Sequence, residues 1–300
     1  MEIIDFHNHH IPPRFEEAVV RAAPYSQRAR WQAIARKLSD EDLLLRDIRE
    51  GDISARVVNM SPALFADASG RVAHETIMAI NDDLARLVAR HSGRIHGLAS
   101  VDAYDGERSA REAERAVREL RLRGLFVDCA RGELMVDAPQ ARPTLEVAAA
   151  LGVPVFVHPV APQPLTRQMV PYGLVGQLFA RGTANSACVV ALAERGVLAQ
   201  LPGLRIVVTS LALGGVAMVA GLSRRSLRQV FMDTNLCHPG VIRAAVGFLG
   251  AGNVIAGSDW PINDGPIRNR LTEAMRQAGL SESEQAVIAA GNCRRLLNIN

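Results

Sequence analysis

The fold follows from the stretch Val153-Pro-Val-Phe-Val-His158-Pro159, a short apolar run that ends in a histidine. A run that is apolar at consecutive positions predicts a strand buried on both faces, as in a parallel sheet. Similar runs recur at seven other places: Glu2–Phe6, Arg56–Met60, Arg94–Val101, Gly124–Cys129, Leu204–Thr209, Val230–Thr234 and Val254–Ser258. The sequence therefore predicts eight buried strands.

Segments with helical spacing of apolar residues separate these strands. The predicted helices are Arg71–Arg90, Arg108–Leu122, Ala141–Leu151, Ala187–Leu198, Pro239–Leu249, Ile267–Ala278 and Ser281–Asn298. Strands that alternate with helices pair in parallel, and eight such units predict a closed (β/α)8 barrel, the TIM barrel of the α/β class. A dinucleotide-binding sheet is not favoured, because no G-x-G-x-x-G motif follows the first strand.

The chain is expected to form a single domain over residues 1–300, because no linker rich in Gly, Ser and Pro divides it. Two connections are long, residues 11–40 after the first strand and residues 159–186 after the fifth. In a barrel, the loops that follow strands lie on the catalytic face. We therefore expect both segments to border the active site as lids or partner contacts.

The composition is that of an ordinary globular protein. The 34 lysines and arginines exceed the 31 acidic residues by only +3, and the arginine-rich segment Arg108–Arg123 is interleaved with glutamates, so nucleic acid is not an expected partner. The N-terminus does not resemble a signal peptide, and no apolar run has the length of a membrane span. These features predict a cytoplasmic protein that acts away from membranes.

Lysine and cysteine usage narrows the chemistry further. Lys37 is the only lysine, so Schiff-base chemistry and a carboxylated-lysine metal bridge are excluded unless Lys37 itself supplies them. The fourth predicted strand ends in Val127-Asp128-Cys129, where a bridging lysine would belong, so a single metal is expected. The four cysteines, Cys129, Cys188, Cys237 and Cys293, form no C-x-x-C pair, and we interpret them as small buried hydrophobic residues.

Three histidines and one aspartate end predicted strands. His7 and His9 leave the first strand two residues apart, so both imidazoles can face the barrel mouth. His158 ends the fifth strand and Asp259 the eighth, and barrel enzymes place their chemistry at these ends. Three imidazoles and a carboxylate suit one divalent ion, with zinc preferred here and manganese as the alternative. Taken alone, the sequence Ser-Asp-Trp-Pro around Asp259 would indicate a turn residue that caps the next helix.

Several motifs in order resemble those of the amidohydrolase-related branch of the amidohydrolase superfamily, the group that contains aminocarboxymuconate-semialdehyde decarboxylase. The similarity runs nearly end to end and includes Asp5-Phe-His7-Asn-His9, Asn81-Asp82, His91-Ser-Gly-Arg94, Val-Phe-Val-His158-Pro159, Gly257-Ser-Asp259-Trp-Pro261 and Gly291-Asn-Cys-Arg-Arg-Leu-Leu297. The resemblance implies a barrel with a mononuclear metal held by His7, His9, His158 and Asp259. It also implies a homodimer.

The sixth predicted strand departs from the family pattern. In the family, a histidine ends this strand, where it polarises the substrate or deprotonates water. Here the run is Leu204-Arg-Ile-Val-Val-Thr-Ser210, so Ser210 or a neighbour occupies the place. A serine hydroxyl can orient a substrate oxygen but cannot hold a proton near neutral pH. Three accounts remain: Asp259 acts alone as the proton shuttle, His238 after the seventh strand substitutes, or the protein is catalytically altered. We favour the first, with His238 as helper, although His238 is equally interpretable as a helix cap.

Substrate contacts are predicted at the same end of the barrel. Arg131 follows the fourth strand beside Asp128, and its planar guanidinium suits a substrate carboxylate. Trp260, next to Asp259, is a further candidate contact. Arg14 and Arg167, in the two long connections, rank below Arg131.

Three functional hypotheses follow for a small-molecule substrate. The first is a metal-dependent hydrolase of a small carboxylated or cyclic compound, such as a lactone, a cyclic amide or a ring-cleavage product, with Asp259 as the proton shuttle. The second is a non-oxidative decarboxylase of an aromatic or muconate-type acid. The third is a binding protein without metal or catalysis on the same barrel. The missing histidine favours the first slightly over the second.

Overall fold

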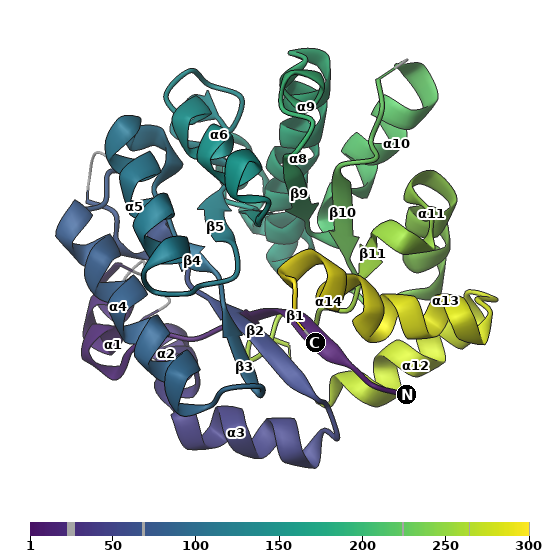
Figure 1. Cartoon of the computed structure of the whole chain (residues 1–300), viewed down its shortest axis with the longest axis horizontal. Coiled ribbons are helices and arrows are strands. Elements are labelled where there is room, and N and C mark those ends of the chain that lie inside the picture. The colour runs from purple at the N-terminus through teal and green to yellow at the C-terminus, as the bar shows by residue number, and fades with distance from the viewer. Residues whose placement is uncertain (23–27, 68–69, 224, 264, 300) are drawn as a thin grey trace.

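The computed structural model describes residues 1–22, 28–67, 70–223, 225–263 and 265–299, and within them eight parallel strands form a barrel (Figure 1). The strands are β1 (Ile4–His9), β2 (Ala55–Asn59), β3 (Ile95–Gly97) continued by β4 (Ala99–Ser100), β5 (Leu125–Asp128), β8 (Pro154–His158), β9 (Arg205–Val208), β10 (Val230–Asp233) and β11 (Val254–Ile255). β3 and β4 are two halves of one strand, interrupted at Leu98, whose N–H donates to the carbonyl of Val58 at 3.0 Å. The small antiparallel pair β6 (Ala130–Arg131) and β7 (Leu134–Met135) follows β5.

Backbone hydrogen bonds between β1 and the residues that follow β11 close the barrel. The N–H of Phe6 donates to Ala256 at 2.8 Å, the N–H of Asp259 donates to His7 at 2.8 Å, and the N–H of His9 donates to Trp260 at 2.9 Å. The predicted (β/α)8 barrel is therefore confirmed. The first strand extends to His9, three residues beyond its predicted end, because these closing bonds continue its pairing past Phe6.

Helices form the outer ring around the strands (Figure 1). They are α1 (Glu16–Ala22), α2 (Arg28–Ser39), α3 (Glu41–Glu50), α4 (His74–Arg90), α5 (Glu107–Arg118), α6 (Arg142–Leu151), α7 (Leu165–Met169), α8 (Gly173–Glu194), α9 (Val197–Gln200), α10 (Leu213–Leu222), α11 (Pro239–Leu249), α12 (Ile267–Gln277), α13 (Glu282–Ala286) and α14 (Asn292–Leu297). The capping box of Ser281 and Glu284 starts α13. The two long connections, residues 11–40 and 159–186, were expected to be loops. In the structure they contain α1, α2, α7 and the first part of α8.

Several helices differ from the prediction. α8 begins at Gly173, fourteen residues before the predicted start at Ala187, and α1, α2, α3, α7 and α10 have no counterpart among the predicted helices. α10 is apolar on all sides and rich in glycine, so it lacks the polar face that makes a helical period visible. Gly215 explains part of this composition, because a Cβ atom there would lie 2.2 Å from the carbonyl oxygen of Ser186 on α8. The missing side chain allows the two helices to pack closely.

The barrel interior is filled by aromatic and aliphatic side chains. Phe6, Phe126 and Phe156 are fully buried there, and Cys293 and Leu296 of α14 belong to the same cluster. α14 therefore covers one end of this core, and the strand ends that carry the histidines lie at the other. Cys129, Cys188 and Cys293 are buried as predicted, whereas Cys237 is only partly buried.

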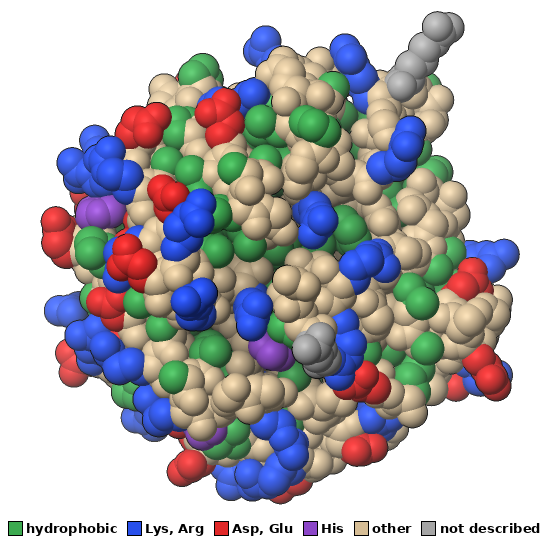
Figure 2. All heavy atoms as spheres, viewed as in Figure 1, with side chains coloured by type: hydrophobic (Ala, Val, Ile, Leu, Met, Phe, Trp, Pro, Cys, Tyr) green, Lys and Arg blue, Asp and Glu red, His purple; other side chains and the backbone are tan. Residues whose placement is uncertain are grey.

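The surface shows how the arginine excess is used. On the face drawn in Figure 2, basic side chains around the helical rim lie among acidic ones. Arg118 pairs with Glu114 at 2.8 Å and Arg276 pairs with Glu273 at 2.6 Å, each within one helix. Such exposed pairs contribute little to stability but keep the helix faces solvated. None of the helices in the described ranges is both long enough and apolar enough to span a bilayer.

Candidate metal centre

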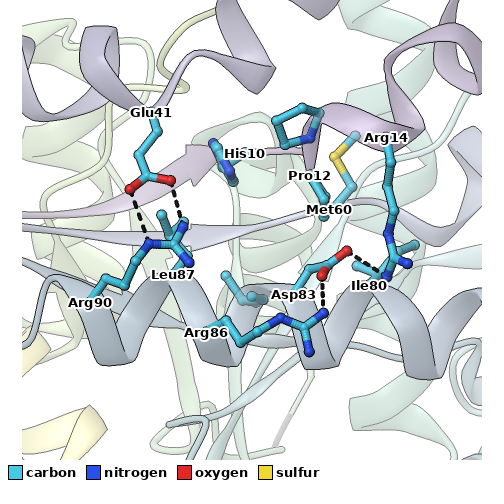
Figure 3. Close-up of a pocket in the computed structure, with 12 residues that line it drawn as sticks. His10, Pro12, Arg14, Glu41, Met60, Ile80, Asp83, Arg86, Leu87 and Arg90 are labelled. Carbon is cyan, nitrogen blue, oxygen red and sulfur yellow. Dashed lines mark hydrogen bonds and ion pairs between the residues drawn. The ribbon is translucent and has the colours of Figure 1, made fainter.

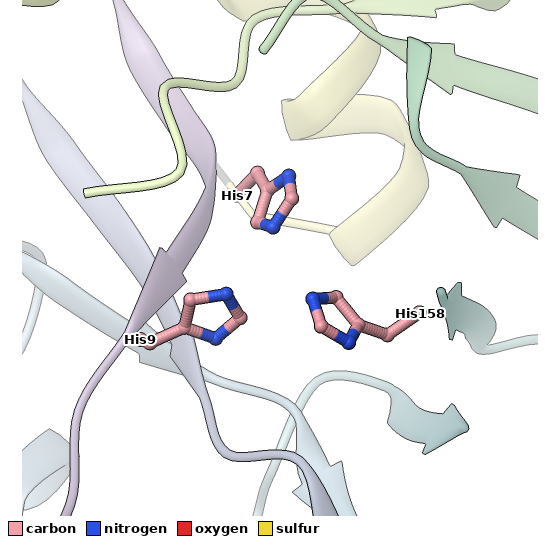
Figure 4. Close-up of side chains that lie close together, drawn as sticks. All are labelled: His7, His9 and His158. Carbon is pink, nitrogen blue, oxygen red and sulfur yellow. The ribbon is translucent and has the colours of Figure 1, made fainter. Parts of the chain in front are cut away.

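Three histidine rings converge at the carboxyl ends of the strands (Figure 4). His7 and His9 lie on β1 and His158 ends β8, and one ligand atom from each lies within 4.8 Å of the others. All three side chains are buried. Residues two apart on a strand share a face, which explains why His7 and His9 point to the same side. The structure thus brings together the three histidines that the sequence singled out.

Asp259 approaches two of these histidines. Its Oδ1 lies 3.1 Å from Nε2 of His9 and 3.5 Å from Nε2 of His7. The backbone of Asp259 is left-handed, with φ at 62°, a conformation that aspartate adopts more readily than most residues. Two residues earlier, a Cβ at Gly257 would lie 2.9 Å from Cβ of His7, so a glycine is needed for this segment to pass beside β1.

Two polar residues orient the β1 histidines. Nδ1 of His7 lies 2.5 Å from Oδ2 of Asp233, and Nδ1 of His9 lies 3.0 Å from Oδ1 of Asn59. Partners on Nδ1 leave Nε2 of each ring free to face the centre, as in most histidine metal sites. Asp233 and Asn59 were not among the predicted site residues. Their position at the ends of β10 and β2 is the signal that could have identified them.

Burial and neighbouring charges set the protonation of the cluster. Burial lowers the pKa of His9, and burial together with His9 and Arg181 holds the pKa of His158 well below its ordinary value. Burial also acts on His7, but the carboxylates of Asp259 and Asp233 outweigh it and raise the pKa of His7. The pKa of Asp259 is lowered, because His7 and His9 outweigh the effect of its burial. Asp259 is therefore ionised, and His9 and His158 are neutral, near pH 7.

These residues fit a divalent metal ion. Nε2 of His7 and Nδ1 of His158 are buried and have no hydrogen-bond partner among the residues that the structure describes. An unpartnered buried nitrogen is costly unless something binds it. Imidazole nitrogens with a carboxylate oxygen are the ligands of zinc-like and manganese-like sites. The arrangement can therefore hold an ion at the barrel mouth.

The two further candidates for proton transfer, Ser210 and His238, lie in different settings. Ser210 is buried; its N–H donates to Oδ1 of Asp233 at 2.8 Å and its hydroxyl donates to Asn235. It therefore supports the residue that orients His7. His238 is exposed, and its Nδ1 accepts from the N–H of Gly240 at 3.2 Å as the N-cap of α11. Its geometry is that of the helix cap, although a catalytic part for either residue stays a prediction.

The predicted substrate contacts already have partners inside the protein. Nη1 of Arg131 donates to Asp102 and Nη2 donates to the carbonyl of Tyr104, each at 2.8 Å. The carboxylate of Asp128 accepts from the Ser61 hydroxyl at 2.6 Å and from the N–H of Ala63 at 2.8 Å. Burial raises the pKa of Asp128 to about 6, although these hydrogen bonds oppose the shift.

Trp260, the third predicted contact, is mostly buried. Its ring lies under the guanidinium of Arg56, 4.3 Å from the ring centroid, and only 5% of the residue is exposed. A role for Arg131, Asp128 or Trp260 in binding substrate stays a prediction.

Arg181 on α8 is a residue that the sequence analysis missed. Its positive charge lowers the pKa of His9, His158 and Asp259. Nη2 donates to the carbonyl of Pro159 at 3.0 Å, and the buried Nε has no hydrogen-bond partner within the described ranges. Sequence analysis did not single out Arg181 because residues 159–186 were predicted as a loop. In the structure Arg181 lies on α8, which starts at Gly173.

Known proteins share this sequence pattern and fold. The family model described as amidohydrolase matches residues 4–299. The chain is 25% identical to the gamma-resorcylate decarboxylase of Polaromonas sp. (strain JS666), in an alignment that covers 95% of this chain and 96% of the relative. It is 22% identical to the 2-amino-3-carboxymuconate-6-semialdehyde decarboxylase of Dictyostelium discoideum, covering 87% and 77% of the two chains.

A solved structure extends the comparison to the fold. The dihydroxybenzoic acid decarboxylase from Polaromonas sp. JS666, with bound manganese and the inhibitor 2-nitroresorcinol, superposes with a TM-score of 0.81. That alignment has 23% identity and covers 99% of this chain and 97% of the other. The resemblance stated from the motifs is therefore confirmed, as is the expectation of an enzyme, and the comparisons support one divalent ion and a small-molecule substrate.

The comparisons overturn the first functional hypothesis. The matching curated relatives are decarboxylases of gamma-resorcylate, aminocarboxymuconate semialdehyde and 6-methylsalicylic acid, so the preference for a hydrolase was wrong. The error came from the missing sixth-strand histidine, which was given weight against decarboxylation. Histidine and carboxylate ligands alone do not separate the two reactions, because both use an ion at the same place in the barrel.

Proposed function

Because the chain belongs to the amidohydrolase family, we propose that it is a metal-dependent decarboxylase that releases CO₂ from a small aromatic or muconate-type carboxylic acid. The observation that carries the proposal is the buried cluster of His7, His9 and His158 beside Asp259, in a chain similar over nearly its whole length to decarboxylases. A hydroxylated benzoate is the substrate class that most of these relatives suggest.

His7, His9, His158 and Asp259 would hold the ion, and manganese is the proposed metal because a structurally similar decarboxylase contains it. When bound, the ion supplies positive charge that binds substrate oxygens and stabilises the negative charge that builds up in the reaction. The neutral state of His9 and His158 suits this role, since a protonated imidazole cannot be a ligand. Asp233 and Asn59 fix the ring orientations through Nδ1 of His7 and His9.

Asp259 is proposed to carry the proton. In the reaction the bond between the ring carbon and the carboxylate breaks, CO₂ leaves, and the electron pair stays on the ring carbon. A new C–H bond then forms with one proton. Because Asp259 is ionised near neutral pH, it must first accept that proton, for which a substrate hydroxyl is a suitable source, and then deliver it to carbon.

Arg181 is proposed to bind the anionic substrate at the mouth. Its charge already acts on His9, His158 and Asp259, and its Nε is available for a hydrogen bond. A guanidinium can accommodate a carboxylate through two parallel N–H donors. Arg181 would thus take the part first predicted for Arg131, whose donors are engaged with Asp102 and Tyr104.

The homodimer predicted from the resemblance also belongs to this proposal. Large apolar side chains are exposed on α8 and α10: Leu174, Val175, Phe179, Met218 and Leu222. Exposed apolar side chains gathered on neighbouring helices are typical of protein interfaces. Val175, at 78% exposed, is the position where an arginine substitution should convert a dimer into a monomer in light scattering.

The activity is tested by incubating the manganese-loaded protein with 2,6-dihydroxybenzoate, 5-carboxyvanillate and 6-methylsalicylate in separate reactions. We expect at least one acid to release CO₂ and the decarboxylated ring in equal amounts, and chelator-treated protein to be inactive. Absence of CO₂ from all three acids and from aminocarboxymuconate semialdehyde, with stoichiometric metal bound, would contradict the proposal.

A further inference from the structure

A cavity separate from the metal centre lies outside the barrel wall. It has a volume of about 250 Å³ and lies between the segment that follows β1, the start of α3 and one face of α4 (Figure 3). His10 lines it, and His10 is the residue next to His9, from which strand alternation turns it away. The cavity is therefore separate from the barrel mouth, although His10 directly follows the last residue of β1.

The wall of this cavity is mainly apolar. Pro12, Met60, Ile80, Leu84 and Leu87 contribute to it. An apolar cavity of about 150 Å³ accepts one benzene ring, and sites for drug-sized ligands begin near 300 Å³. The volume here suits a single substituted six-membered ring.

His10 supplies one polar group in the wall. The residue is only 6% exposed, and its Nδ1 is buried without a hydrogen-bond partner in the part of the chain described by the structure. A hydroxyl group can both donate and accept a hydrogen bond, so it would satisfy Nδ1 with either nitrogen of the ring protonated.

The rim of the cavity is positively charged. Arg14 and Arg86 both pair with Asp83, and Arg90 pairs with Glu41 at 2.5 Å (Figure 3). Three guanidinium groups thus face two carboxylates, which leaves one positive charge in excess. The arginine side chains are more than half exposed, so they can reorient toward a ligand.

We propose that this cavity binds a small hydroxylated aromatic monocarboxylate, with its ring against the apolar wall, its hydroxyl hydrogen-bonded to Nδ1 of His10 and its carboxylate at the arginine rim. The site adjoins the metal centre through the backbone. His10 follows His9, and Met60 follows Asn59, the residue that orients His9. A molecule in the cavity would contact both segments that hold this ligand of the metal. The binding proposal does not depend on the decarboxylase activity.

The test compares 4-hydroxybenzoate with benzoate, which lacks the hydroxyl, as probes in NMR saturation-transfer titrations of the full-length, chelator-treated protein. We expect 4-hydroxybenzoate to bind about fivefold to tenfold more tightly, as one hydrogen bond to a buried nitrogen without another partner predicts. His10→Phe should bring the two affinities within about twofold of each other, because a phenyl ring has no nitrogen to bond the hydroxyl. Equal affinities of both acids for the unmodified protein would overturn the proposal.

A surface variant provides a second test that does not disturb the buried wall. Arg86→Glu should weaken binding of both acids about fivefold or more, because it reverses one charge of the rim. Arg276→Glu is the matched control, because Arg276 is likewise an exposed helix arginine paired with an acid three residues earlier. Equal effects of the two variants, or no effect of either, would also overturn the proposal.

Discussion

His9 and His10 are adjacent in the chain and almost equally buried, at 7% and 6% exposed, yet they belong to different regions. His9 faces the barrel mouth, where Asn59 and Asp259 hold its two nitrogens. His10 faces the cavity beside α4, where its Nδ1 has no hydrogen-bond partner among the described residues, and burial lowers its pKa to about 4. Two residues of the same type, the last of β1 and the one that follows it, therefore acquire different chemistry because their side chains point to opposite sides of the chain.

The charges around the two regions explain the difference. Side chains from several strands converge at the mouth, where Asp259 contacts two histidines and Arg181 adds a positive charge. Beside α4, each acidic group is already paired with arginine. Converging ligands suit a metal ion, whereas a paired rim around an apolar wall suits an organic molecule. Four predictions test this contrast.

Metal retention should separate the two sides most strongly. His158→Ala is expected to reduce manganese content from about one ion per chain to near zero, because it removes one of three converging imidazoles. His10→Phe should retain the ion, because His10 faces away from the centre. Elemental analysis after dialysis measures both. Loss of the ion in His10→Phe, with retention in His158→Ala, would reverse the assignment of the two regions.

Asp259→Asn should have the next largest effect. An amide cannot carry the proton, so kcat should fall about 1,000-fold or more while the circular dichroism spectrum and most of the metal are retained. Steady-state kinetics with the best acid of the decarboxylation assay measure the change. Full turnover by the asparagine variant would show that another group transfers the proton, and His238→Ala in the same assay then tests the helper.

Arg181→Met should act mainly on substrate binding. We expect KM to rise about tenfold or more, since a charge-assisted hydrogen bond to a carboxylate is lost. Arg131→Met is the competing variant, because sequence reasoning placed the carboxylate contact there. A larger KM effect from Arg131→Met, at equal thermal stability, would restore that first assignment and reject Arg181.

The smallest expected effect is the pH dependence of stability caused by Asp128. It measures how strongly the barrel mouth excludes water from this carboxyl group. Burial raises its pKa from 3.8 in the unfolded chain to about 6, so the folded state favours its protonated form. Asp128 therefore stabilises the folded state fully below pH 4. As the pH rises through 6, the free energy of unfolding falls by about 3 kcal/mol in total. Urea unfolding of metal-free protein from pH 4 to pH 8 measures it.

The matched variant for this experiment is Asp128→Asn, which cannot ionise. Its free energy of unfolding should change less with pH over the same interval, whatever its absolute stability. Identical pH dependence of the two proteins would mean that water or the Arg181 charge keeps Asp128 ionised at little cost.

Much of the fold was predictable because its signals are local. Eight short apolar runs and the helical periods between them are properties of neighbouring residues, and closing a parallel barrel is the usual way to bury such strands. α10 and the first half of α8 were not predictable in this way. Their apolar and glycine-rich faces make sense only where Gly215 meets the backbone of Ser186.

The same division holds for the site. The order of residues along the chain is enough to predict the ring of strands and to place His7, His9, His158 and Asp259 at strand ends. The partners of those residues follow only from how the chain packs: Asp233 and Asn59 bond the histidines of β1, and Arg181 on α8 bonds the carbonyl next to His158. The tertiary structure also decided that His10 turns to a separate cavity. Such contacts depend on how distant segments pack, so a position at a strand end can mark Asp233 and Asn59 as candidates but does not say which histidine each one contacts.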